Sequence, residues 1–186
     1  MDAPIKPNTF GIQILHFHPT SDYLIWTGNE GCDGSQENCH AKAYYSINHG
    51  RTWDLIETYV RNCQWARDSE LKIDDTQILC ESYRDKTGSQ RFFQSDNPLE
   101  LVGGTKFFQK KKKLFDHVAG FAKFSEFLIV AEVIRFLLGR TFTDSYLLKY
   151  VPSLDSLDLQ VSLDGRNFAT GKFPPNMHPE THASFL

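Results

Sequence analysis

The chain has 186 residues, 40% of them hydrophobic, which is enough for one ordinary domain with a core. Its net charge of −3 at pH 7 gives no overall electrostatic reason to bind nucleic acid or an anionic membrane. Fifteen Phe, seven Tyr and three Trp favour half-buried strands, where aromatic side chains pack well. The composition therefore indicates a β-rich domain.

Short strand-like runs follow one another along the chain, each ending at a turn signal. They lie at residues 11–18, 23–27, 43–46, 53–60, 63–66, 77–83 and 91–94. Further strands are expected at 106–110, 116–122 and 124–132, although the last run could also begin a helix that continues to Leu138. A helix would be the only one in this pattern, so we expect a strand. Many short strands with regular turns predict an all-β sandwich, barrel or propeller.

Neither a membrane span nor an export signal is expected. The longest apolar stretch, 121–139, is interrupted by Lys123, Glu126, Glu132 and Arg135, whereas a span needs about 20 mostly apolar residues. The first residues carry no apolar segment of the signal-peptide type. The run of lysines at 110–113 is interpreted as a solvated turn or edge rather than as a docking patch.

All four cysteines lie within one stretch of the chain, at Cys32, Cys39, Cys63 and Cys80. An even, clustered set is typical of a local disulfide framework formed in an oxidising compartment. A zinc site is the weaker alternative, because neither CxxC nor HxxxH spacing is present. The cysteines suggest an exported protein, but the chain shows no export signal. This conflict suggests that the chain is a fragment.

Two segments resemble Asp-box hairpins. The first is Ser46, Asn48, Gly50, Thr52 and Trp53, and the second is Ser162, Asp164, Gly165 and Phe168 in a form one residue shorter. Asp or Asn accepts hydrogen bonds from its own turn, Gly supplies a left-handed backbone, and the aromatic residue packs beneath the hairpin.

The spacing of the two boxes is also informative. Ser46 and Ser162 are 116 residues apart, or two units of 58, and a unit of that length suits a four-stranded propeller blade. No intact middle copy is visible, and residues 94–98 are at best a remnant. We assign both boxes a structural role, with no part in catalysis or ligand binding.

Other motifs are more specific than the boxes, and they come in a fixed order. They lie at 18–22 (HPTSD), 26–32 (WTGNEGC), 39–46 (CHAKAYYS), 62–65 (NCQW), 80–85 (CESYRD), 91–98 (RFFQSDNP) and 173–179 (FPPNMHP). Together they resemble the fungal vacuolar protein-sorting receptors of the sortilin family, over roughly residues 9–134 and 158–180.

The resemblance implies that residues 1–186 form part of a luminal ten-bladed propeller, about three antiparallel four-stranded blades. Such receptors bind soluble vacuolar hydrolase precursors or peptides in the late Golgi, release them at endosomes and recycle. It implies a luminal location in the Golgi, endosome or vacuole, and no cofactor, metal or catalytic residue. A chain made without an export signal would stay in the cytosol with all four cysteines as thiols.

The resemblance also implies the disulfide pairs Cys63–Cys80 and Cys32–Cys39. Cys63 and Cys80 lie on two facing strands that a hairpin can bring together. Residues 135–157 depart from the family, as an inserted helix or a stretch read in a shifted frame, and this departure puts the third blade in doubt.

Two other functions remain open. A sialidase-type glycosidase would need three clustered arginines with a Tyr/Glu pair and an acid. Arginines occur at Arg51, Arg61, Arg67, Arg84 and Arg91, but on turns and strands where surface roles are expected. Glu57 and Tyr59 are two residues apart on one strand face, which is an ordinary arrangement. His16 and His18 could share a strand face as metal ligands, but no third ligand is near in sequence. The chain could also be the non-functional relic of a receptor gene, because an open stack of blades leaves exposed β edges.

Overall fold

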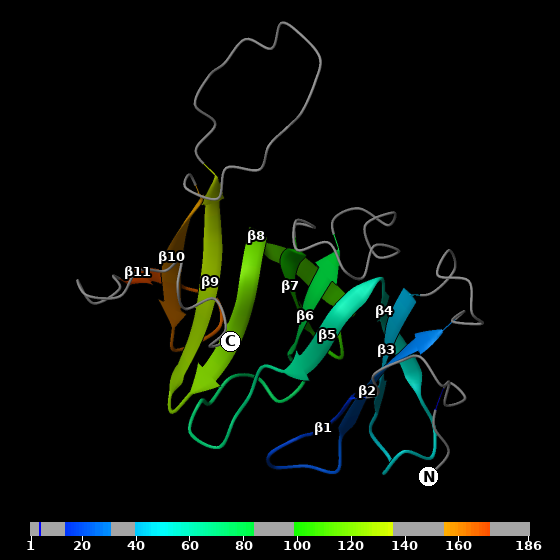
Figure 1. The fold of residues 1–186 in the computed structure, drawn as a ribbon. Coiled ribbons are helices and arrows are strands. Elements are labelled where there is room, and N and C mark those ends of the chain that lie inside the picture. Colours follow the sequence, from blue (N-terminus) through cyan, green and yellow to red (C-terminus); the bar gives the residue numbers. More distant parts are fainter. Residues whose placement is uncertain (1–3, 5–13, 31–39, 84–98, 136–154, 172–186) are drawn as a thin grey trace, which may run out of the picture.

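A computed structural model describes residues 4, 14–30, 40–83, 99–135 and 155–171, and within these ranges the chain forms strands and no helix (Figure 1). The strands are β1 (Ile14–Phe17), β2 (Leu24–Glu30), β3 (His40–Ser46), β4 (Asp54–Thr58), β5 (Val60–Trp65), β6 (Ile78–Tyr83), β7 (Leu99–Thr105), β8 (Lys110–Phe124), β9 (Phe127–Arg135), β10 (Asp155–Ser162) and β11 (Ala169–Gly171).

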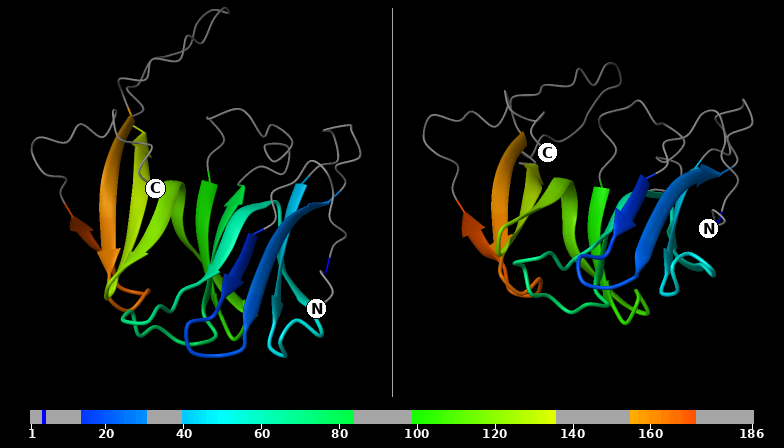
Figure 2. Two further views of the ribbon diagram at one scale, coloured as in Figure 1. Left: turned by 60° about the horizontal axis from the view of Figure 1, so that its bottom comes forward. Right: turned by 90° about the horizontal axis from the view of Figure 1, so that it is seen from below.

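Two antiparallel sheets contain all of these strands. One has the order β1-β2-β3-β4, and the other runs β11-β10-β9-β8-β7-β6-β5, so within each sheet every strand pairs with its neighbours along the chain. β4 and β5, which follow one another in the chain, lie in different sheets. Figure 2 shows the strands following one another across the molecule, from the β1–β4 sheet at one side to β11 at the other. The prediction of an all-β, antiparallel, propeller-like fragment is therefore confirmed, and the described strands do not close into a barrel.

The seven-stranded sheet contains two four-stranded units that share β8. Residues 110–115 of β8 pair with β7, residues 120–124 pair with β9, and Val118 pairs with both strands. Between the two parts lies His117, whose φ is 55°. Tyr59 lies 58 residues earlier in the chain and also has a left-handed backbone, with a φ of 58°. It stands between β4 and β5, where the chain passes from blade 1 to the next blade.

These changes of partner define three blades. Blade 1 is β1–β4, blade 2 is β5, β6, β7 and residues 110–115 of β8, and blade 3 is residues 118–124 of β8 with β9, β10 and β11. The 58-residue interval between Tyr59 and His117 equals the unit inferred from the two boxes. Each blade therefore corresponds to one repeat of the sequence.

Two apolar clusters hold the blades together. The first includes Ile25, Ala43, Trp65, Ile78 and Phe108, and so lies between blades 1 and 2. The second combines residues of blade 2 with residues of blade 3; it includes Leu79, Leu101, Phe121, Leu128 and Val130. Burial at about 25 cal/mol per Å² of apolar surface makes these seams the main stabilising contacts between blades.

One sequence expectation is wrong. Residues 106–110 do not form a strand: 106–109 form the turn between β7 and β8, and the strand lies earlier, at Leu99–Thr105. Gly103 and Gly104 hide this strand in the sequence, because glycine weakens a strand signal. A side chain at Gly104 would meet Phe108 at 2.5 Å, so the glycine is needed where the turn folds back over β7.

The third blade forms in spite of its atypical sequence. β9 pairs with β10 from Leu128 to Arg135, with Asp155 opposite Arg135 and Ser162 opposite Leu128. The 124–132 run is thus a strand rather than a helix for most of its length. Residues 136–154, most of the departing segment, and the expected strand at 91–94 lie outside the described residues.

Candidate functional site

The first box is a tight turn between β3 and β4, at the edge of blade 1. The Ser46 hydroxyl accepts hydrogen bonds from the backbone N–H groups of Asn48 (3.3 Å) and Gly50 (2.9 Å). The Asn48 side-chain oxygen accepts from the N–H groups of Arg51 (3.1 Å) and Thr52 (2.9 Å). Gly50 has a φ of 76°, which glycine adopts without steric cost.

The second box repeats this arrangement between β10 and β11. The Ser162 hydroxyl accepts from the N–H groups of Asp164 (3.3 Å) and Gly165 (2.9 Å), and Gly165 has a φ of 67°. The Asp164 carboxylate accepts from the N–H groups of Arg166 and Asn167, both at 2.8 Å. Two turns 116 residues apart therefore share one hydrogen-bond pattern at the same place in blades 1 and 3.

The aromatic residues that follow the boxes lie at blade seams or half-buried edges. Phe168 packs edge-on against Phe115, with ring centroids 4.8 Å apart, and joins the second apolar cluster. Trp53 is half-buried next to β4. The hydrogen bonds given above for Ser46, Asn48, Ser162 and Asp164 stay within their own turns.

The matching turn of blade 2 lies at 106–109 and has no box. Lys106, Phe107 and Phe108 take left-handed φ angles of 51°, 55° and 68° in succession. Phe107 stacks on Tyr45 of blade 1 at 5.1 Å, and Phe108 is buried in the first cluster. Aromatic contacts to blade 1 thus replace the hydrogen bonds of a box. Residues 94–98, considered as a remnant, lie outside the described residues and do not occupy this turn.

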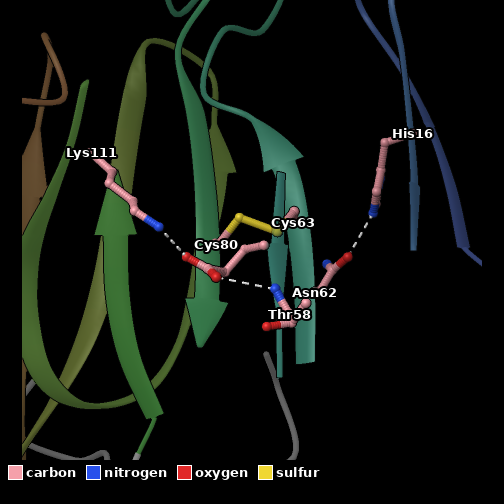
Figure 3. Close-up of a disulfide and its surroundings, with 7 residues drawn as sticks. His16, Thr58, Asn62, Cys63, Cys80 and Lys111 are labelled. Atoms are coloured by element: carbon pink, nitrogen blue, oxygen red, sulfur yellow. Dashed lines mark hydrogen bonds and ion pairs between the residues drawn. A yellow bond between two sulfur atoms is a disulfide. The ribbon is translucent and has the colours of Figure 1, made fainter. Parts of the chain in front are cut away.

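Cys63 and Cys80 form a disulfide inside the first cluster. They lie directly opposite each other on β5 and β6, with Cα atoms 4.1 Å apart, and both side chains are fully buried (Figure 3). The cross-link joins two neighbouring strands of blade 2, within the apolar cluster that blade 2 shares with blade 1. Cys32 and Cys39 lie outside the described residues, so their pairing stays a prediction.

Polar contacts join the first strands of the three blades, namely β1, β5 and residues 118–124 of β8, which we call the first-strand edge. His16 of β1 and Asn62 of β5 are 3.0 Å apart between Nε2 and Oδ1 (Figure 3). Lys123 of β8 donates from Nζ to the backbone oxygens of Trp65 (3.1 Å) and Arg67 (3.3 Å) at the end of β5. Each contact joins one blade to the next.

Arg61 of β5 is a second cation of the first-strand edge, after Lys123. Its guanidinium donates to both carboxylate oxygens of Glu81 on β6, at 2.9 and 3.2 Å, and to the backbone oxygen of Ala119 on β8 at 3.3 Å. Burial raises the pKa of the Glu81 carboxyl, and the charge and hydrogen bonds of Arg61 oppose that rise. Arg61 is 45% exposed, so the charge remains partly available to solvent.

Sequence reasoning missed Asn62, Glu81 and Lys123. The one available signal was Glu81, an ionisable residue that directly follows the apolar run Ile78, Leu79 and Cys80 in a strand. A charged residue in such a run usually has a buried partner. Naming that partner requires knowing that β5 and β6 are neighbours.

The residues considered for metal binding or catalysis do not converge. His16 contacts Asn62, whereas His18 packs against Trp65 with ring centroids 5.0 Å apart. No group of three or more His, Cys, Asp or Glu side chains could hold a metal in the described part of the chain.

The glycosidase arrangement is likewise scattered over separate contacts. Glu57 pairs with Lys111 at 2.7 Å, and the Tyr59 ring stacks on His40 at 4.8 Å. Arg61 binds Glu81, and Arg67 binds Asp75 at 2.9 Å. Arg84 and Arg91 lie outside the described residues. Glu57, Tyr59, Arg61 and Arg67 thus each contact a different residue and do not form one site.

The lysine run at 110–113 begins β8 and is exposed throughout. Lys111 pairs with Glu57, and Lys113 pairs with Asp116 at 2.8 Å and Glu100 at 3.5 Å. Exposed pairs of this kind contribute about 0–1 kcal/mol each. The run behaves as a solvated strand face.

Comparison with known proteins gives one family and several relatives. The family model Sortilin-Vps10, described as "Sortilin, neurotensin receptor 3", matches residues 1–186. A vacuolar protein sorting/targeting protein 10 from Laccaria bicolor is 59% identical over 181 residues, and one from Mycosarcoma maydis is 46% identical over 183 residues. Both alignments cover 97% of this chain and 11% of the relative, so the chain spans about a tenth of those proteins' length.

A solved structure of an acylaminoacyl peptidase from Pyrococcus horikoshii resembles the fold, with a TM-score of 0.54. The likeness covers 90% of this chain and 26% of the peptidase, at 7% sequence identity. At that identity the likeness concerns the fold alone. No helix long and apolar enough to cross a membrane occurs among the residues that the structure describes.

Proposed function

The chain belongs to the Sortilin-Vps10 family, and from this premise we propose that it supplies early blades to the luminal propeller of a vacuolar sorting receptor. The receptor binds soluble hydrolase precursors or peptides in the late Golgi and delivers them to endosomes and the vacuole. The observation that carries the proposal is the 59% identity to a vacuolar protein sorting/targeting protein over 97% of this chain.

The role of the chain within that receptor is structural support and part of the binding surface. Residues 1–186 belong to a single propeller domain in this proposal, because the blades share cores and one continuous chain path. The two Asp-boxes close the outer hairpins of blades 1 and 3. The Cys63–Cys80 disulfide supports a luminal location, because such bonds persist in oxidising compartments.

The proposed receptor fragment is not an enzyme and needs no cofactor. The residues weighed for glycoside hydrolysis have separate partners, Lys111 for Glu57 and His40 for Tyr59. The structural likeness to a peptidase rests on the fold at 7% identity and carries no activity. A relic with no function is the remaining alternative, and the binding experiment decides between it and the receptor.

Binding is tested in a complete luminal domain. The luminal domain of the Laccaria bicolor relative is made with this chain in place of its own matching segment, and a second version lacks the segment. Both are titrated with an immobilised vacuolar hydrolase precursor. We expect the chimera to bind as the parent does and the deletion to lose binding. A chimera that folds but binds no better than the deletion would favour the relic.

A further inference from the structure

His18 lies at the seam between blade 1 and blade 2. It directly follows β1 and begins the turn of residues 18–23, which leads into β2. Its ring is 5% exposed and packs edge-on against Trp65 of β5, with Tyr23 on another side at 5.5 Å. The imidazole therefore fills the place where the turn of blade 1 meets the end of β5.

A hydrogen bond of this turn requires a neutral imidazole. The backbone N–H of Thr20 donates to Nδ1 of His18 at 3.2 Å, and the backbone N–H of His18 donates to the Tyr23 oxygen at 2.9 Å. Nδ1 can accept only while it carries no proton, so the neutral ring holds its hydrogen on Nε2. Protonation would place a second hydrogen on Nδ1, directly facing the Thr20 N–H.

The surroundings of the ring disfavour a positive charge. Burial is the largest effect, and it lowers the pKa of His18; the Arg67 and Lys123 cations act in the same direction. The Asp75 carboxylate and backbone act in the opposite direction, although Arg67 already binds that carboxylate at 2.9 Å. Nε2 is buried and has no hydrogen-bond partner among the described residues. A charged ring would thus lose its bond at Nδ1.

A second histidine contacts the same turn. His49, in the first box, approaches Asp22 of the 18–23 turn at 3.2 Å between Nε2 and Oδ2, and both side chains are largely exposed. Any test of His18 must therefore separate the two histidines.

We propose that His18 is an acid-sensitive latch: protonation of its ring breaks the Thr20–His18 hydrogen bond and loosens the 18–23 turn of blade 1 from Trp65 of blade 2. This device goes beyond the proposed receptor function and does not depend on cargo. Because the folded state favours the neutral ring, the stabilising contribution is complete above about pH 6.5 and declines as the pH falls.

The latch is tested on the full chain by NMR, through the ring carbons of His18 and the amide proton of Thr20. We expect the two signals to titrate together, with one midpoint below the ordinary histidine value of about 6.5. The Trp65 indole signal should shift at the same midpoint. A Thr20 amide that does not move while His18 titrates would overturn the proposal, and so would a ring midpoint above that value.

A matched variant separates the ring charge from the hydrogen bond. His18→Asn keeps an acceptor near the position of Nδ1 but cannot titrate. In the wild-type chain the protection of the Thr20 amide from hydrogen exchange, corrected for intrinsic rates, should fall by up to about tenfold per pH unit as the pH drops below about 6.5. His18→Asn should abolish this fall, and His49→Asn should leave it in place. A fall that persists in His18→Asn but disappears in His49→Asn would assign the effect to the His49–Asp22 contact and reject the latch.

Discussion

Asn48 and Asp164 occupy the same place in their turns, but only Asp164 can ionise. The Asn167 and Arg166 backbone N–H groups, with the side chain of Asn167 and the Ser162 hydroxyl, hold the pKa of the Asp164 carboxyl well below its usual range. A carboxylate with a lowered pKa stabilises the folded state above its unfolded pKa of about 3.9, and the contribution is lost as the pH falls through the folded value. The two boxes should therefore respond differently to acid.

The prediction for this residue compares Asp164→Asn with the wild-type chain. At neutral pH the variant should melt slightly lower, because Asn keeps the acceptor for the N–H groups but loses the charge. Below about pH 4 the difference should shrink, because only the wild type loses a carboxylate. Melting curves from pH 7 to pH 2.5 measure it. A constant difference across that range would show that the charge plays no part.

A second prediction at this scale concerns the Arg61–Glu81 pair. Arg61→Ala leaves a buried carboxylate without its cation, which costs about 3–5 kcal/mol in a fully buried pair. Since Arg61 is 45% exposed, we expect roughly 2 kcal/mol at pH 7. Because burial raises the pKa of Glu81, acidification should protonate it more readily than an ordinary glutamate and reduce the loss. Glu81→Gln added to Arg61→Ala should recover part of the stability in urea unfolding, and no recovery would refute the pairing.

At the scale of the element, the local signals gave most strands but not their partners. Residues 24–27, 43–46 and 78–83 lie in strands as expected, because alternating β-branched and aromatic residues mark them. β7 was not predicted, because Gly103 and Gly104 carry no side chain and so weaken the strand pattern. Phe107 and Phe108 resemble a strand in the sequence but lie in a left-handed turn. Tertiary contacts with blade 1, such as Phe107 with Tyr45, stabilise that turn, and no local pattern encodes them.

In the candidate site, too, the local turns could be predicted from the sequence and the contacts between blades could not. The hydrogen-bonding residues of both boxes could be named from sequence, because each bonds within its own turn. The contacts of the first-strand edge could not, because His16 and Asn62 are 46 residues apart and meet only after blades 1 and 2 pack. The spacing of the boxes nevertheless contained the repeat length, which the strand changes at Tyr59 and His117 reproduce.

The prediction at this scale concerns the first box. Trp53→Ala should destabilise the chain more than alanine at any of the lysines 110–113. Removing a buried Trp costs about 3–5 kcal/mol, and the half-buried Trp53 should cost roughly half of that. The lysines are exposed, so their replacement should stay within about 1 kcal/mol, even where an ion pair is lost. Lys112→Ala is the control; equal shifts in melting temperature would remove the structural role of the box.

At the scale of the whole molecule, the outer face of blade 1 leaves large apolar side chains exposed. Phe17 and Leu55 are 69% and 53% exposed on β1 and β4, and large apolar side chains of this kind are usually covered. Family resemblance implies a ring of many blades, in which a neighbouring blade would cover such a face. We therefore expect the 186-residue chain alone to self-associate and to hold any binding surface poorly.

The corresponding prediction is that the isolated monomer shows no useful cargo binding. A partial site loses contacts and must also order side chains, at about 0.5–1.5 kcal/mol for each one immobilised. The chain is prepared in an oxidising compartment, its monomer is isolated, and a vacuolar hydrolase propeptide is titrated by calorimetry. Saturable one-to-one binding by the monomer would prove this wrong and place a self-sufficient site in these blades.

The central claim, that this chain is a working part of a vacuolar sorting receptor, is tested most directly by sorting in a cell. A fungal strain lacking its own receptor is given the Laccaria bicolor relative with this chain in place of the matching segment, and the secreted fraction of a soluble vacuolar hydrolase is measured. The account predicts that the chimera retains the hydrolase in the cell as the unaltered relative does. Secretion at the level of the strain without a receptor, from a chimera present at normal abundance, would contradict it.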